Sequence, residues 1–282
     1  MKLLRPFLMI FCLLFIAQGL EKVWGDGSSE KILANWIKKT NQKLPPKIRS
    51  YFEFYINEVA LLQKNQWKSQ KEFDAKFGLP DSKIPMRSMD LKSALGLHVA
   101  SVKMDRNDKS ITLTNLYSVK VDGVESLIAF YGRDKDCNSI VLSIYFKTAK
   151  TYTEVFSEQA KYDCLSKVHI AALSDKGPYF YHFFNQTSAT TVNEIFFPLV
   201  SGLPSAKPLV FSIWHGGVYF KDFDGDGKKE IISGLREYGN PPEIEKQLDD
   251  YYGITKYTIY KWNNTKFDKL GDYYSRQMAP GD

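Results

Sequence analysis

The hydrophobic pattern of the chain changes its period near residue 98, and this change most constrains the fold. Before it, apolar residues recur at the three- and four-residue spacing of amphipathic helices, in stretches over residues 30–43, 48–62 and 69–77. After it, short runs such as residues 110–114 and 139–146 alternate apolar with polar side chains. Alternation of this kind is typical of strands with one buried face. The chain is therefore predicted to be mainly antiparallel β, propeller-like or sandwich-like, behind an N-terminal helical segment.

The first residues have the pattern of a secretory signal peptide over residues 1–19. Lys2 and Arg5 precede an apolar run that is too short to span a bilayer. Small residues then predict cleavage before Leu20, with a second candidate position near Gly25. We expect an exported protein, periplasmic or secreted, without a stable membrane anchor.

The remaining chain is predicted to comprise a helical N-terminal segment, residues 20–90, and an antiparallel β domain, residues 91–282. Two cysteines remain in it, Cys137 and Cys164. In an oxidising compartment such a pair favours a disulfide. A redox or metal-binding pair is less favoured, because the spacing is not Cys-x-x-Cys.

The net charge of +6 is unevenly distributed, since residues 20–88 hold 13 Lys and Arg against 8 Asp and Glu. A solvated helical face accounts for this excess most simply. Contact with anionic polymers or lipids is the alternative. Export and the lack of any basic motif with groove-reading spacing argue against nucleic acid as a partner. The partner expected is a protein or a glycan, which the sequence does not identify.

The run from Asp222 to Glu230 is the one motif whose residue types and spacing require specific chemistry. Asp222, Asp224 and Asp226 alternate, a glycine follows each of the last two, and Glu230 stands four residues later. Hard carboxylate oxygens favour calcium, and the backbone carbonyl of Lys228 would add one more. The glycines permit the positive φ angles of a tight loop. Four carboxylates in nine residues repel one another without a cation, so calcium is preferred over an ion-free acidic turn.

The surroundings of this run do not fit a helix-loop-helix calcium site. That site requires a bidentate Glu at the twelfth loop position, where Ser233 stands when Asp222 is counted first. It also requires helix on both sides, whereas residues 218–220 and 231–232 have the apolar and aromatic composition of strands.

The pattern Asp-x-Asp-Gly-Asp-Gly-x-x-Glu followed by Ile-Ile resembles instead the calcium loops of FG-GAP repeats. These are the integrin-α-type, VCBS-like units of β-propellers and of many exported bacterial proteins. The resemblance implies that Asp222, Asp224, Asp226 and Glu230 are calcium ligands, with Glu230 in place of the commoner Asp. It covers residues 216–272 and, faintly, residues 118–156. A propeller needs at least four blades, and two such units, one with an intact loop, can be traced.

No catalytic motif accompanies the loop. The four histidines, His98, His169, His182 and His215, are scattered without metal-ligand spacing, and the aromatic run over residues 179–184 is expected to place half of its side chains in the core. The expected function is that of an exported calcium-binding protein of non-catalytic, binding or structural type, in which calcium orders the C-terminal hairpin. The alternative is a secreted envelope or carbohydrate-active hydrolase, which would need two opposed carboxylates in an aromatic-lined cleft.

Overall fold

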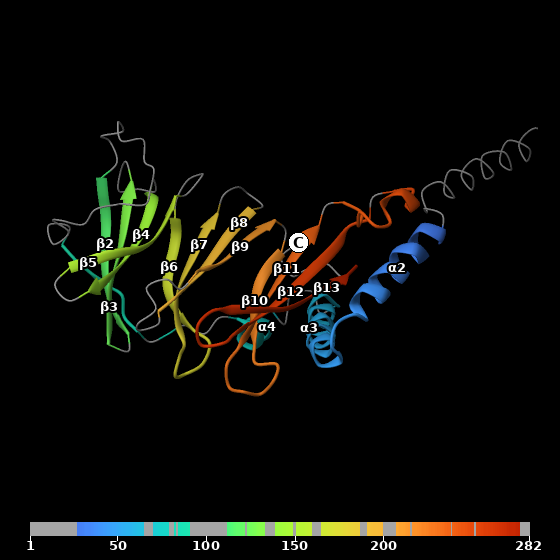
Figure 1. Cartoon of the computed structure of the whole chain (residues 1–282), viewed down its shortest axis with the longest axis horizontal. Helices are drawn as coiled ribbons and strands as arrows, with labels where there is room; N and C mark the ends of the chain where they lie inside the picture. The colour runs from blue at the N-terminus through green and yellow to red at the C-terminus, as the bar shows by residue number, and fades with distance from the viewer. Residues whose placement is uncertain are drawn as a thin grey trace, which may run out of the picture.

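The chain is built from three antiparallel sheets and a group of helices, as its computed structural model shows. The structure describes residues 27–64, 70–78, 82, 84–90, 112–121, 123–132, 139–148, 151–159, 165–186, 191–199, 207–214, 216–237, 239–250 and 252–276. Figure 1 shows the sheets in a row along the long axis, with helices α2 and α3 at the end where the third sheet lies. The prediction of a mainly antiparallel β protein with an N-terminal helical segment is confirmed.

The helices correspond to the three stretches with helical spacing. They are α2 (Gly27–Asn41), α3 (Pro46–Lys64) and α4 (Gln70–Phe77). Proline is favoured at the first position of a helix, because its missing N–H would have no intrahelical acceptor there. Pro46 therefore begins α3.

Each sheet is a meander in which successive strands are hydrogen-bonded neighbours. The first sheet contains β1 (Arg87–Ser88), β2 (Thr112–Val121), β3 (Val124–Gly132), β4 (Ser139–Thr148) and β5 (Thr151–Gln159). The second contains β6 (Leu165–Ala172), β7 (Tyr179–Gln186), β8 (Thr191–Pro198) and β9 (Leu209–Trp214). The third contains β10 (Gly216–Lys221), β11 (Glu230–Glu237), β12 (Ile254–Trp262) and β13 (Phe267–Ser275). Because β1 pairs with β2, strand structure begins inside the segment that the sequence predicts to be helical.

The first two sheets pack face to face through an apolar core. It contains Ile128, Leu142 and Ile144 from the first sheet and Tyr181, Phe183 and Phe197 from the second. All six side chains are buried. The alternating positions of β3, β4, β7 and β8 therefore supply one layer of contacts, as strand geometry requires.

The opposite face of the second sheet packs on the third sheet. Phe180, Phe196 and Phe211 there contact Phe220, Ile231 and Trp262. Sheets cover both faces of β7, so the consecutive residues from Phe180 to Phe183 are all buried. The prediction that only half of this aromatic run lies in the core is wrong, because it assumed one solvent-exposed face.

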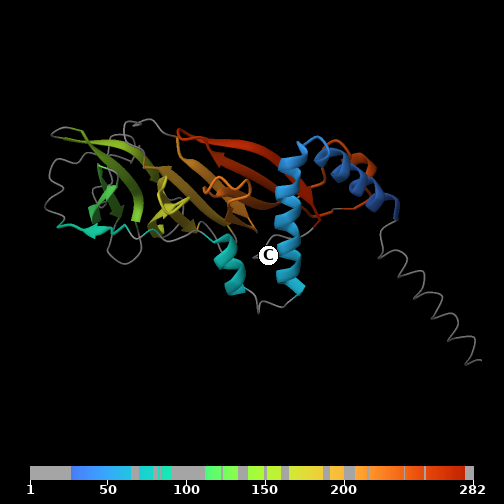
Figure 2. The same ribbon diagram turned by 90° about the horizontal axis from the view of Figure 1, so that it is seen from below.

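Helices α3 and α4 cover the remaining face of the third sheet, and Figure 2 shows them beside it. Phe52, Tyr55 and Val59 of α3 pack with Ile232, Tyr257 and Ile259 of the sheet. The molecule thus consists of successive layers: sheet, sheet, sheet and helices.

The last strand, β13, is an edge strand whose backbone is partly satisfied by α2. The side-chain amide of Asn41 donates to the carbonyl oxygen of Tyr274 at 2.9 Å, and its oxygen accepts from the N–H of Tyr274 at 2.9 Å. Asn41 is 5% exposed. One side chain therefore takes the place of a neighbouring strand at this position.

The two units expected from the sequence over residues 118–156 and 216–272 fall in the first and third sheets. Gly123 lies between β2 and β3, and the acidic loop lies between β10 and β11. Gly123 and Gly227 have φ angles of 81° and 82°. Between these two meanders the structure contains a third, β6–β9, for which the sequence predicts no unit.

Candidate metal centre

The acidic loop joins two adjacent antiparallel strands. Lys221 at the end of β10 pairs with Glu230 at the start of β11, and residues 222–229 lie between them. Strand on both sides is what the sequence predicts, and it excludes a helix-loop-helix site at this position.

Backbone N–H groups fix the loop by hydrogen bonds to its own carboxylates. Asp222 accepts from Gly225 through Oδ1 at 2.8 Å and from Gly227 through Oδ2 at 2.9 Å. Asp224 Oδ1 accepts from the amide of Asp226 at 3.3 Å, and Asp226 Oδ1 accepts from Lys228 at 2.8 Å. The second carboxylate oxygen of Asp224 and that of Asp226 take no part in these backbone hydrogen bonds.

Three of the four predicted carboxylate ligands come together. Each of Asp222, Asp224 and Asp226 offers a carboxylate oxygen, and these oxygens lie within 4.8 Å of one another. Glu230, the fourth predicted ligand, is 1% exposed. Its Oε2 accepts from the N–H of Phe223 at 2.8 Å, so Glu230 closes the loop from the start of β11.

A cation from another strand reaches these carboxylates. Lys261 of β12 donates through Nζ to Asp224 Oδ2 and, at 2.7 Å, to Asp226 Oδ2. The same Nζ lies 3.4 Å from Glu230 Oε1. The sequence analysis did not identify Lys261, because it stands 35 positions from Asp226.

The pKa of Glu230 is raised, whereas that of Asp226 is lowered. Burial raises the pKa of Glu230, and the nearby charge of Asp224 adds to that effect. The hydrogen bond from Lys261, followed by the one from the backbone of Lys228, lowers the pKa of Asp226. Burial opposes the charged form of Lys261, but its hydrogen bonds to Asp224 and Asp226 and the charges of Glu230 and Asp224 together raise its pKa.

The donor set fits a hard divalent cation. All of the converging side-chain ligands are carboxylates, which calcium prefers. In addition, Glu230 Oε1 is buried and accepts no hydrogen bond in the part of the chain that the structure describes. A buried carboxylate oxygen without a hydrogen-bond donor is costly, and a metal ion bound directly to it would remove that cost.

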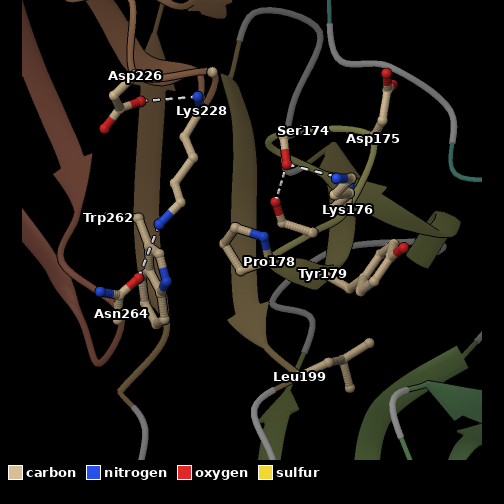
Figure 3. A pocket seen from close by; sticks show the side chains of 12 residues that line it. Ser174, Asp175, Lys176, Pro178, Tyr179, Leu199, Asp226, Lys228, Trp262 and Asn264 are labelled. Atoms are coloured by element: carbon tan, nitrogen blue, oxygen red, sulfur yellow. Dashed lines mark hydrogen bonds between the residues drawn. The ribbon is translucent and has the colours of Figure 1, made fainter.

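Lys228, the fifth predicted site residue, has a second role. Its side chain extends from the loop to the turn between β12 and β13, where Nζ donates to Asn264 Oδ1 at 2.9 Å (Figure 3). This contact adds to the amide hydrogen bond with Asp226. The proposed contribution of its carbonyl to a metal remains a prediction.

The outer side of the loop packs on the helices and on the second sheet. Phe223 stacks on Tyr51 of α3 with ring centroids 5.3 Å apart. Lys229 donates from Nζ to the carbonyl oxygen of Gly78 at 3.1 Å and from its backbone N–H to Leu173 at 2.9 Å. The loop therefore contacts α3, the end of α4 and the second sheet.

A cleft adjoins the loop. One cavity of about 700 Å³ lies between the turn that joins β6 to β7, the acidic loop and the turn that joins β12 to β13. Figure 3 shows Trp262, Asn264 and Lys228 along one side of it and Ser174, Pro178 and Tyr179 along the other. A second cavity of about 660 Å³ shares Ser174, Asp175, Tyr179 and Gly227 with the first. Both polar and apolar side chains line this cleft.

Two histidines that are distant in sequence also come together. His182 Nδ1 lies 3.1 Å from His169 Nε2, and His182 Nε2 lies 2.8 Å from Glu194 Oε2. His182 stacks on Phe196 with centroids 4.4 Å apart. The interpretation of the histidines as scattered is wrong for this pair, because β6 and β7 bring them to paired positions.

Several sequence predictions fall outside the described residues. These are the signal peptide over residues 1–19, the disulfide between Cys137 and Cys164, and any role of His98 and His215. Among the described helices, none has the length and apolar character needed to cross a membrane.

Comparison of the chain with protein-family models, curated proteins and solved structures found no match.

Proposed function

We propose that the loop between β10 and β11 binds calcium and that this binding orders the C-terminal sheet of an exported protein. Asp222, Asp224, Asp226 and Glu230 would hold the ion, with the carbonyl of Lys228. Calcium would supply the positive charge that lets four carboxylates share one small volume. The role is one of binding and structure, and no step of chemistry is assigned to the ion.

The observation that carries this proposal is the convergence of three carboxylates within 4.8 Å beside a buried Glu230 oxygen that lacks a hydrogen bond. Carboxylates this close repel one another unless a positive charge lies among them, and the ammonium of Lys261 lies beside two of them.

The contacts of the loop indicate what an ion would do for the molecule. Phe223, Lys228 and Lys229 join the loop to α3, to the turn before β13 and to the second sheet. A bound ion would restrict the loop and, through it, these three neighbours. The adjacent cleft supports a binding role, because a protein or glycan ligand in it would contact the loop that the ion restricts.

The test is a thermal unfolding experiment on chelator-treated protein. Calcium at a hundredfold excess over its Kd should raise Tm by about 5–10 °C, since a ligand of the native state stabilises it by mass action. Magnesium should raise Tm less, because it requires a smaller and more regular oxygen shell. Potassium chloride at equal ionic strength controls for screening.

Two variants locate the effect. Asp224→Asn should abolish the calcium shift, because it removes a central carboxylate. Asp175→Asn is the matched control, since Asp175 is an exposed carboxylate of the same cleft outside the loop. A wild-type Tm that calcium leaves unchanged, or a shift that survives in Asp224→Asn, would refute the proposal.

A further inference from the structure

Lys261 contacts the loop through the oxygens that the loop's own backbone does not use. The N–H group of Asp226 donates to Oδ1 of Asp224, and the N–H group of Lys228 donates to Oδ1 of Asp226. The ammonium of Lys261 donates to Oδ2 of Asp224 and to Oδ2 of Asp226. A cation bound to Oδ2 of both residues would take the place of this ammonium.

Glu230 shows that the ammonium fills this position incompletely. Its Oε1 lies 3.4 Å from Lys261 Nζ. Within the described part of the chain, this buried oxygen accepts no hydrogen bond. The ammonium offsets the charge of Glu230 but donates no hydrogen bond to its Oε1. An ion with six to eight oxygen ligands can bind all of these groups at once.

The side chain of Lys261 has a route out of the loop. It is 28% exposed, and Asp226, one of its partners, is 38% exposed. A lysine stem is flexible, and its ammonium is strongly hydrated in water. Movement to solvent therefore requires no rearrangement of β12.

We propose that Lys261 is an intramolecular competitor for the cation site. In the metal-free protein its ammonium holds Asp224, Asp226 and Glu230 together, and it leaves when a divalent cation binds. This inference rests on the calcium-binding function proposed above and adds its regulation. The loop is then never without a positive charge, and each binding event must displace one. Competition of this kind weakens binding and favours a Kd in the range of extracellular calcium modules, about 10⁻⁴–10⁻³ M.

The first test compares the calcium affinity of variants by isothermal titration calorimetry. Lys261→Met keeps a long side chain and removes the ammonium, so its Kd should fall by about tenfold or more, because a charge-assisted contact no longer has to be broken. Without metal, the same variant should have a lower Tm than the wild type. Lys256→Met is the matched control, since Lys256 lies on the same strand and forms an ion pair with Glu237 away from the loop. Its Kd should equal that of the wild type.

Each result of the titration decides between the two proposals. If only Lys261→Met binds calcium, Lys261 excludes the ion and the calcium function of the wild type fails. If the wild type and Lys261→Met bind equally well, the calcium function stands and the competition is refuted. If Lys261→Met loses binding that the wild type has, the competition is again refuted. If neither binds, both proposals fail.

The second test uses the unaltered protein, so it does not depend on whether a variant folds. Lysine acetylation followed by mass spectrometry should show slow modification of Lys261 in chelator and faster modification in calcium. Lys256 should react at the same rate in both conditions. Modification of Lys261 that calcium slows or leaves unchanged would overturn the displacement.

Discussion

Two glycines of the acidic loop hold backbone conformations that other residues adopt at a cost. Gly225 and Gly227 have φ angles of 77° and 82°, and a Cβ atom added at either position would meet no atom within 4 Å. The space around them is open, so the requirement for glycine comes from the backbone alone.

Replacing Gly227 with alanine should lower the free energy of unfolding by about 1 kcal/mol, because L residues are disfavoured at positive φ. Gly227→Asn should cost less, since asparagine adopts this conformation more readily. Urea denaturation of the chelated protein measures both values. Equal losses for the two variants would show that something other than the backbone angle is responsible.

The sequence could predict the loop's carboxylates because they are neighbours along the chain, whereas Lys261 depends on strand pairing. Ile231 of β11 pairs with Tyr260 of β12. This register brings the next residue of β12, Lys261, to the position beside Glu230. A prediction of that register would have indicated the contact, since cross-strand neighbours interact. Alternation alone predicts that β12 is a strand but not which residue of β11 it faces.

At the scale of elements, α3 is held by its buried aromatic face. Phe52 is fully buried and stacks on Tyr273 of β13 with centroids 5.3 Å apart, whereas Phe54 is 39% exposed. Both residues are phenylalanines of the same helix, two positions apart. A difference between their alanine variants therefore measures the effect of burial.

Phe52→Ala should reduce the free energy of unfolding by about 3–5 kcal/mol, because it removes a buried ring and leaves a cavity. The matched variant Phe54→Ala should cost about 1 kcal/mol, since much of its ring is already in water. Chemical denaturation followed by circular dichroism gives both numbers. Similar losses at the two positions would contradict the packing described for α3.

Helices and outer strands were easier to predict than the central sheet. The apolar stripes of α2, α3 and α4 face one side, so helical spacing is visible in the sequence. In β7, the residues from Phe180 to Phe183 are buried on both faces. Period two disappears from the hydrophobic pattern when both faces are covered. Consecutive residues of β11 are buried on both faces as well, but the acidic loop before β11 marks that unit in the sequence, and no such motif marks the second meander.

At the scale of the whole molecule, the N-terminal helices and the C-terminal sheet share one core. Phe52, Tyr55 and Val59 cover Ile232 and Ile259, which stand more than 170 positions later in the chain. The division into a helical segment and a β domain therefore describes the sequence better than it describes the packing.

A chain that begins at residue 82 should not fold stably alone, because Ile232, Tyr257 and Ile259 would face water. We expect it to bind hydrophobic dyes and to aggregate, since large exposed apolar patches promote association. Supplying residues 27–78 as a separate chain should reduce dye binding. A monomeric truncated protein that unfolds cooperatively, as judged by gel filtration and calorimetry, would contradict the shared core.

Asn41 has a consequence for how copies of this protein meet. An unpaired edge strand is a template on which a second molecule can add its own strand and begin a fibre. Asn41 occupies the N–H and carbonyl group of Tyr274 with its own amide, and α2 lies against β13. The N-terminal helix therefore covers part of the edge to which a strand of another molecule would have to pair.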